Sequence, residues 1–187
     1  MNRFGLLIDL YCMKRNSETV LTEWLVINSQ MGEAEALQQL LSIWYPKLLG
    51  YAVQLLNSQT AAHDVTQMTL LGISKDIKKI RDPAAFPKWA FQLLRYKCAD
   101  HIKHKQRDKT FESELQHYMQ TDLQETKPDC DATHFELTML DPDSRQLVYL
   151  HYFEEFSLHD VAQILSVPIG TVKSRLYAIR QQLKAML

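Results

Sequence analysis

Apolar positions recur at helical spacing in two consecutive segments near the end of the sequence. The first set follows i, i+3, i+4 and i+7 and comprises Leu158, Val161, Ala162 and Leu165. The second follows i, i+4, i+7 and i+11 and comprises Val172, Leu176, Ile179 and Leu183. Ser157 is the expected N-cap of the first helix, and residues 166–170 leave room only for a sharp turn. Pro168 disfavours helix at the residue before it, so the pattern predicts a helix-turn-helix, whose second helix enters the major groove of DNA.

The remaining positions of the second helix favour this interpretation. Between residues 166 and 187 there are four Lys or Arg and no Asp or Glu, and a helix N-terminus with free N–H groups suits a phosphate. We therefore expect DNA contacts from Gly170, Thr171, Lys173, Ser174, Arg175, Tyr177 and Arg180. Arg175 lies beside the core position Leu176 and has the alternative of turning inward. The other interpretation of the whole segment is an ordinary amphipathic hairpin with a solvated basic face.

Residues 164–176 resemble region 4 of sigma-70 family factors, and most closely the small extracytoplasmic-function (ECF) class. The run Val-Pro-x-Gly-Thr-Val-Lys-Ser-Arg-Leu at 167–176 carries the resemblance. Members usually have Gly where Ser166 stands, and a non-glycine residue in a left-handed turn costs roughly 1 kcal/mol. They also usually have Arg-Ala where this chain has Ala178 and Ile179, so one basic contact is missing.

Residues 33–107 have the pattern of a helical bundle. The first helical face is formed by Leu37, Leu40, Leu41 and Trp44, and beyond Pro46 a further set comprises Leu48, Leu49, Ala52, Val53 and Leu56. After a loop at 57–60, a helix over 61–80 has Val65, Met68, Leu71 (or Gly72) and Lys75 along one side. After a second loop at 81–85, a long helix over 86–105 has a predicted buried face of Phe86, Trp89, Ala90, Leu93, Leu94, Cys98 and Ile102.

This bundle resembles region 2 of the same family. The family's Asp-Leu-Val-Gln-Glu-Thr-Phe stands here as Asp-Val-Thr-Gln-Met-Thr-Leu at 64–70. In the family this helix docks on the clamp helices of the largest RNA polymerase subunit, so the resemblance implies core polymerase contacts from Asp64, Gln67, Met68 and Leu71. Met68 replaces a carboxylate that members usually have.

Charge is strongly segregated along the chain, although its net value is only −1. Residues 86–109 hold seven basic and two acidic residues, whereas 110–143 hold nine acidic residues and Lys127 alone. The local field decides where a polyanion binds, so the basic helix is a second candidate DNA surface. Tyr96 stands where members usually have Asn and is placed to stack on an unpaired base. The loop at 82–85 resembles the one that, in ECF factors, holds a flipped base of the −10 element. Together, this loop and the basic helix give the candidate −10 contacts: Asp82, Lys88, Arg95, Tyr96, Lys97, Lys103, Lys105 and Arg107.

The expected organisation is all-α, with two small helical domains. Residues 1–30 form an N-terminal extension, expected to be loosely ordered, and 31–109 the region 2-like domain. Residues 110–142 form a flexible acidic linker, and 143–187 form the region 4-like domain, opened by a capped helix with Leu147, Leu150 and His151 or Phe153 facing inward. The linker is too short for a region 3 domain, which points to the ECF class.

Several classes of protein are disfavoured. Cys12, Cys98 and Cys130 are widely separated, which favours a reducing cytosol over disulfides or a zinc site. No run of eighteen apolar residues occurs, so no membrane span is expected. No nucleotide-binding, hydrolase or metalloprotease motif appears, so we expect no enzyme activity, no cofactor, no metal and no small-molecule substrate.

The resemblance over both domains therefore implies a cytoplasmic sigma factor. It would bind core RNA polymerase and promoter DNA, reading the −10 element with the first domain and the −35 element with the second. The class also implies an anti-sigma partner. Two alternatives stay open: a sigma mimic that sequesters an anti-sigma factor, and a free-standing helix-turn-helix regulator, for which no dimerisation helix or ligand pocket is visible.

Overall fold

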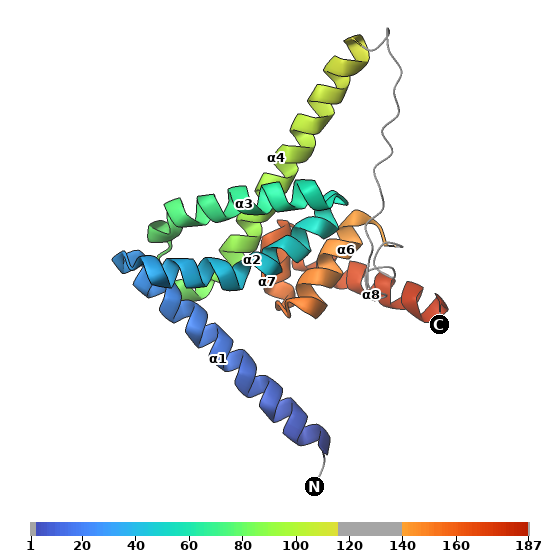
Figure 1. Cartoon of the computed structure of the whole chain (residues 1–187). Helices are drawn as coiled ribbons and strands as arrows, with labels where there is room; N and C mark the ends of the chain where they lie inside the picture. The colour runs from blue at the N-terminus through green and yellow to red at the C-terminus, as the bar shows by residue number, and fades with distance from the viewer. Residues whose placement is uncertain (1–2, 116–139, 187) are drawn as a thin grey trace.

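The computed structural model describes the backbone of residues 3–115 and 140–186, and side chains within 17–107 and 140–182. All regular structure in these residues is helical, as predicted. Four long helices come first: α1 (Arg3–Met31), α2 (Ala34–Leu56), α3 (Gln59–Asp76) and α4 (Phe86–Leu115). The 3-10 turns η1 (Ile77–Lys79) and η2 (Pro83–Ala85) join α3 to α4. The second part contains α6 (Pro142–Val148), the π-helical turn η4 (Tyr149–Phe153), α7 (Leu158–Leu165) and α8 (Ile169–Met186) (Figure 1).

Helices α1–α4 form the N-terminal domain, in which α2, α3 and α4 pack around one apolar core. Trp44 lies edge-on to Phe86 and Phe91, with ring centroids 5.1 and 6.1 Å apart. Tyr51 and Phe91 are fully buried beside them. Aromatic pairs in this geometry add to the stability that area burial supplies, and they fix how α4 crosses α2.

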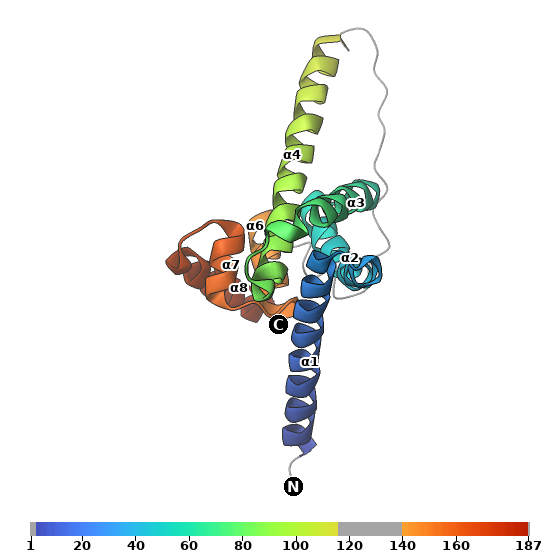
Figure 2. The same ribbon diagram turned by 90° about the vertical axis from the view of Figure 1, so that its left-hand side faces the viewer.

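The N-terminal segment differs from the expectation of a loosely ordered extension. It is part of α1, and Leu25 and Val26 of this helix are fully buried in the core. The Gln30 side chain donates hydrogen bonds of 2.9 and 2.8 Å to the carbonyl oxygens of Ile77 and Ile80. These bonds tie the end of α1 to η1, so the second half of the helix belongs to the domain. The first half extends away from the rest of the molecule in both views (Figures 1 and 2).

Helix boundaries follow local signals in most places. The loop expected at 57–60 is shorter: Asn57 ends α2 in the left-handed region at φ 49°, and Ser58 caps α3. Helix α2 runs without interruption through Pro46, where the sequence indicated two successive faces. Helix α4 continues to Leu115, and of its predicted buried face Phe86, Ala90, Leu94 and Cys98 are buried. Trp89 and Leu93 are only partly buried, and Ile102 is 38% exposed because α4 has left the bundle there.

Helices α6–α8 form the C-terminal domain. Asp141 caps α6, because its Oδ1 accepts hydrogen bonds of 3.1 Å from the N–H groups of Asp143 and Ser144. The hydrogen bond from the Ser144 side chain, with these backbone bonds, lowers the pKa of the Asp141 carboxyl below its usual value. Leu147 and Leu150 are buried as predicted, whereas His151 is only half-buried and Phe153 is exposed. Most of the acidic linker lies at 116–139, outside the described residues.

Candidate nucleic-acid interface

The helix-turn-helix is present as predicted. The Ser157 hydroxyl accepts a 3.1 Å hydrogen bond from the N–H of Asp160 and so caps α7. Ser166 ends α7 in the left-handed region at φ 57°, and the next N–H, of Val167, donates back to the Ala162 carbonyl over 3.0 Å. This hydrogen bond closes a Schellman motif, in which the left-handed residue is usually glycine. Ser166 therefore adopts the left-handed conformation at the cost of roughly 1 kcal/mol given above. Buried Val172 then fixes α8 against α7.

Helix α8 presents its polar side to solvent. Lys173, Ser174, Tyr177 and Arg180 are exposed, as is Gly170, while Thr171 is half-buried. Two of the basic residues have partners that the sequence did not indicate. Arg175 Nη1 donates to Asp143 Oδ2 over 3.0 Å, and Arg180 Nε donates to the Tyr152 hydroxyl over 2.9 Å. The guanidinium of Arg180 also lies over the Tyr152 ring, 6.0 Å from its centroid.

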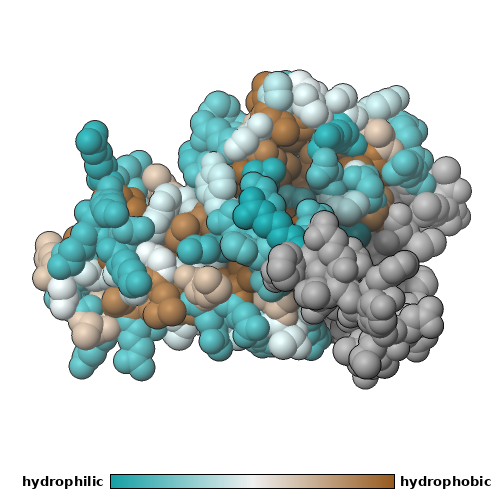
Figure 3. Space-filling model, turned by 90° about the horizontal axis from the view of Figure 1, so that it is seen from above, coloured by the Kyte–Doolittle hydropathy of each residue, from teal (hydrophilic) through white to brown (hydrophobic). Residues whose placement is uncertain are grey.

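Helix α4 presents a second basic surface. Tyr96, Lys103, Lys105 and Arg107 are exposed, whereas Arg95 and Lys97 are half-buried. The side of the molecule toward which the second half of α4 points is mostly hydrophilic, and apolar residues reach that surface only in separate areas (Figure 3). Two candidates at the start of α4 are engaged. Asp82 Oδ1 accepts a 3.0 Å hydrogen bond from the N–H of Ala84, and Lys88 forms a 3.4 Å ion pair with Asp160 of α7.

The four candidate polymerase contacts share one exposed face of α3. Asp64, Gln67, Met68 and Leu71 fall at i, i+3, i+4 and i+7 and are all exposed. Met68 and Leu71 have more than half of their surface in contact with solvent. The opposite face is buried and comprises Val65, Thr66, Thr69 and Ile73. Val65 therefore does not share a side with Met68, Leu71 and Lys75, as the sequence pattern had predicted, because these three are exposed. Helix α3 is therefore anchored on one side and carries an apolar patch with polar neighbours on the other, an arrangement typical of interaction surfaces.

The two domains pack directly on each other. Tyr51 donates to Gln146 Oε1 over 3.3 Å, and Arg145 Nη1 donates to Asn57 Oδ1 over 2.7 Å. The rings of Phe91 and Phe156 meet edge-on at 5.4 Å. Figures 1 and 2 show α6 and α7 beside α2 and α4. The two candidate DNA surfaces are thus held in one body, an arrangement the sequence left open.

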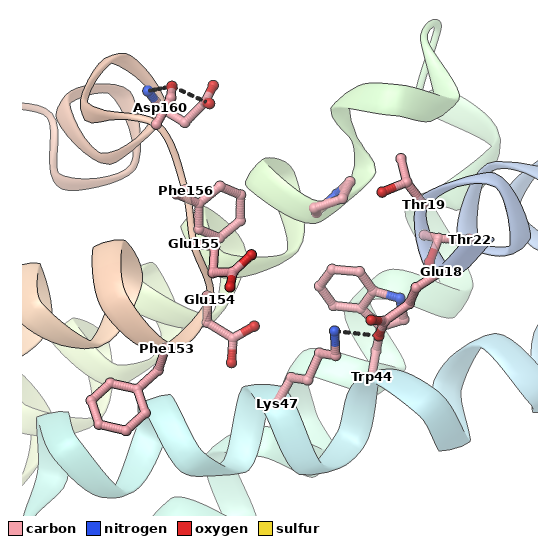
Figure 4. A pocket seen from close by; sticks show the side chains of 12 residues that line it. Glu18, Thr19, Thr22, Trp44, Lys47, Phe153, Glu154, Glu155, Phe156 and Asp160 are labelled. Atoms are coloured by element: carbon pink, nitrogen blue, oxygen red, sulfur yellow. Dashed lines mark hydrogen bonds and ion pairs between the residues drawn. The ribbon is translucent and has the colours of Figure 1, made fainter. Parts of the chain in front are cut away.

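A cavity of about 510 Å³ lies in this domain interface, between α1, α2 and the segment that joins η4 to α7. Glu18 and Lys47 form a 2.5 Å ion pair on one side, while Glu154 and Glu155 face the same space from the C-terminal domain (Figure 4). Burial raises the pKa of Glu154 to about 7, and the attraction of Lys47 opposes this rise. The interface therefore contains a carboxyl that titrates near neutral pH.

Within 17–107 and 140–182 no group of three His, Cys, Asp or Glu side chains could hold a metal ion. None of the described helices is long and apolar enough to cross a membrane. Burial raises the pKa of the Cys98 thiol to about 12, which makes it unreactive rather than a nucleophile.

Comparison with known families matches both domains. Residues 40–108 match the model of sigma-70 region 2, and residues 132–183 match that of sigma-70 region 4. Relatives include the ECF RNA polymerase sigma factor SigW of Bacillus subtilis, 24% identical over 83% of this chain and 91% of SigW. The RNA polymerase sigma-H factor of Pseudomonas aeruginosa is 25% identical over 84% of this chain and 89% of the sigma-H factor.

Two solved structures have similar folds. One is the sigma factor RpoE in complex with the anti-sigma factor NepR from Bartonella quintana, with TM-score 0.60 and 25% identity over 79% of this chain and 94% of RpoE. The other is CnrH in complex with the cytosolic domain of CnrY, with TM-score 0.61 and 20% identity over 89% of this chain and 96% of CnrH. The second likeness concerns the fold alone.

Proposed function

The chain belongs to the extracytoplasmic-function class of the sigma-70 family, and from this we infer that it binds core RNA polymerase and directs promoter-specific initiation. The observation that carries the proposal is the arrangement of α8. It follows a closed turn, is anchored by buried Val172, and presents an outward face without a single carboxylate. Such a helix can enter the major groove without repelling phosphates.

We assign the −35 element to this helix. Lys173, Ser174 and Tyr177 would face base edges, because they are exposed in the first half of α8. Phosphates would be held by the N–H of Gly170 and by the side chains of Thr171, Arg175 and Arg180, since the N–H of Thr171 donates to the Pro168 carbonyl over 2.9 Å. Arg175 would have to leave Asp143 to reach a phosphate, whereas Tyr152 already orients Arg180.

We assign the −10 element to η2 and α4. Tyr96 is exposed for stacking, and the basic side chains that follow it would hold the backbone of melted DNA. The assigned residues are Asp82, Lys88, Arg95, Tyr96, Lys97, Lys103, Lys105 and Arg107. Lys88 is paired with Asp160 in the closed arrangement, so binding at this position competes with domain packing.

Core polymerase would dock on the exposed face of α3 through Asp64, Gln67, Met68 and Leu71. The protein would act in the cytoplasm with the polymerase and without chemistry of its own. Because RpoE was solved with an anti-sigma factor, we propose a partner of this kind for this chain too.

Run-off transcription with purified core RNA polymerase on genomic fragments tests the proposal. We expect new, specific transcripts only when the protein is added, and their start sites would give the promoter sequence. Silence despite tight polymerase binding would favour a mimic that titrates an anti-sigma factor. Silence without polymerase binding would favour a free-standing regulator.

A further inference from the structure

An exposed tyrosine of η4 is bonded to an exposed arginine of α8. Tyr152 has 49% of its surface in contact with solvent, and its hydroxyl oxygen accepts a 2.9 Å hydrogen bond from Arg180 Nε. The guanidinium also lies over the Tyr152 ring, 6.0 Å from its centroid. Contacts between two exposed side chains add little to stability, so the fold gives no reason for this pair.

Arg180 lies on the side of α8 that is assigned to DNA. Lys173, Tyr177 and Arg180 are spaced i, i+4 and i+7, so they follow one another along one side of the helix, and all three are exposed. The N-terminal residues of a recognition helix reach the bases, whereas its later residues meet the sugar-phosphate backbone. Tyr152 therefore borders the DNA-facing side of α8 at the position of a phosphate contact.

The π-helical turn η4 sets the direction of Tyr152. Such turns are frequent at functional sites. Within η4, Leu150 is buried and Phe153 lines the interface cavity, while Tyr152 reaches α8 (Figure 4). The ring of His151 meets the ring of Tyr152 with centroids 4.9 Å apart, and His151 Nδ1 donates to the Phe156 carbonyl over 2.9 Å. The tyrosine is thus supported from below by a ring that is itself held in place.

The pair has unused donors that converge on one point. Arg180 Nε gives its only hydrogen to the Tyr152 oxygen, and one Nη hydrogen of the rigid guanidinium points in the same direction. An oxygen that accepts this second hydrogen would lie beside the tyrosine hydroxyl, at hydrogen-bond distance from it. Among the described residues, neither the Tyr152 O–H nor the Nη groups of Arg180 have another hydrogen-bond partner. Because the hydroxyl oxygen accepts a bond from a cation, its own O–H is a stronger donor.

We propose, resting on the proposed contact of α8 with DNA, that Tyr152 and Arg180 together bind one phosphate of the DNA backbone. Tyr152 donates its O–H and Arg180 donates from Nη to the phosphate oxygens. An anion is the ligand that fits, because the site offers only donors and one positive charge. The nearest acidic residues in sequence, Glu154 and Glu155, line the interface cavity instead (Figure 4).

Binding of the full-length protein to a fluorescently labelled DNA duplex of mixed sequence, over a range of salt concentrations, is the first test. Tyr152→Phe keeps the ring and loses the O–H, so it should bind at least about tenfold more weakly, as expected for a hydrogen bond to a charged group. Its salt dependence should be unchanged, because no charge is lost. Arg180→Ala should lower the slope of log K against log salt by about 0.9. Tyr45→Phe is the matched control, because the Tyr45 hydroxyl also bonds a basic side chain, His63 over 2.7 Å, but lies in α2, and it should bind like the wild type.

A double variant distinguishes one shared phosphate from two separate contacts. Tyr152→Phe combined with Arg180→Ala should bind about as weakly as Arg180→Ala alone, because without the guanidinium nothing holds the tyrosine hydroxyl at the phosphate. Arg180→Lys keeps the charge and should keep the salt slope, yet Tyr152→Phe should have little effect in this background, because lysine lacks the fork. Fully additive losses overturn the proposal. So does a Tyr152→Phe variant with wild-type affinity, or a wild-type protein that does not bind the duplex.

Two further measurements separate this contact from folding and from the sigma function. Tyr152→Phe should keep the midpoint of thermal unfolding, and a clearly lowered midpoint would mean that the pair supports the fold and would overturn the proposal. Specific run-off transcripts from a wild type whose duplex binding does not depend on Tyr152 would refute the shared phosphate alone. Coupled effects of Tyr152 and Arg180 in a protein that yields no transcripts would support the shared phosphate and refute the sigma function.

Discussion

A methyl group at position 50 tests whether the two domains pack as described. Gly50 lies in α2 and faces Tyr149 of η4 across the domain interface. A Cβ at this position would lie 2.2 Å from the Tyr149 hydroxyl oxygen and 3.2 Å from its Cζ. Non-bonded heavy atoms settle at roughly 3.5–4 Å, so the hydroxyl would have to move by more than one ångström.

Tyr149 has little freedom to make that movement. Its ring stacks on Phe153 with centroids 5.5 Å apart and lies 5.7 Å from the ring of Tyr51, while its hydroxyl donates to the Lys47 carbonyl over 3.4 Å. Overpacking of this kind usually costs about 1–3 kcal/mol. For a chain of this size each kcal/mol lowers the midpoint of thermal unfolding by about 2–4 °C. Gly50→Ala should therefore destabilise the protein measurably in thermal and denaturant unfolding.

Two further variants make this prediction specific. A Cβ at Gly170 meets no atom within 4 Å, so Gly170→Ala should be neutral or slightly stabilising. Adding Tyr149→Phe to Gly50→Ala removes the clashing oxygen and leaves Cζ, at 3.2 Å, as the nearest atom of residue 149. The double variant should lose less stability than the sum of its single variants. If Gly50→Ala unfolds like the wild type and shows no coupling to position 149, the domains do not pack as described.

Further predictions concern pH, DNA and polymerase. The raised pKa of Glu154, about 7, means that the folded state holds a proton that the unfolded state releases, so stability should fall as pH rises from the ordinary glutamate range through about 7. Urea unfolding across this range should show that slope in the wild type and a flatter one in Glu154→Gln. Arg180→Ala should reduce the salt dependence of promoter binding by about one phosphate contact, and Lys173→Ala should relax base preference at one position. If target genes are still induced when this pair of substitutions abolishes DNA binding, direct promoter recognition is wrong. Leu71→Asp should weaken polymerase binding at least about tenfold. Because Leu71 is exposed, the same substitution should change the free energy of unfolding by less than about 0.5 kcal/mol, and a loss of helix content would contradict that expectation.

The helix-turn-helix could be predicted because its determinants are local. The cap at Ser157, the turn at Ser166 and the apolar spacing on both sides all lie within a few residues of the features they specify. Local hydrogen bonds and helical periodicity decide such elements whatever the rest of the chain does. In α3, by contrast, the predicted face is wrong beyond Val65: Met68 and Leu71 are exposed, because the buried side includes two threonines, Thr66 and Thr69, which apolar spacing does not indicate.

Helix α1 was missed for a physical reason. Its apolar residues lie on two opposite faces, and its buried face includes the hydroxyls of Thr22 and Ser29. The apolar residues therefore do not follow the spacing of a single helical face, and the sequence does not indicate an amphipathic helix. Ser29 is accommodated in the core because its hydroxyl donates to the Leu25 carbonyl over 2.6 Å, a bond within the helix that no spacing reveals.

The domain interface was unpredictable because its partners are far apart in the chain, yet it does not argue against the DNA contacts assigned from sequence. Lys88 and Asp160 are 72 residues apart, and neither has a local feature that indicates the other. Their pair, like that of Arg175 with Asp143, has side chains about a third exposed or more. Such pairs contribute about 0–1 kcal/mol, because water solvates the separated charges almost as well. A DNA phosphate can therefore displace either carboxylate at little cost, because binding releases the counterions that surround the DNA. The domain interface would resist opening mainly through its apolar contacts, such as that of Phe91 with Phe156.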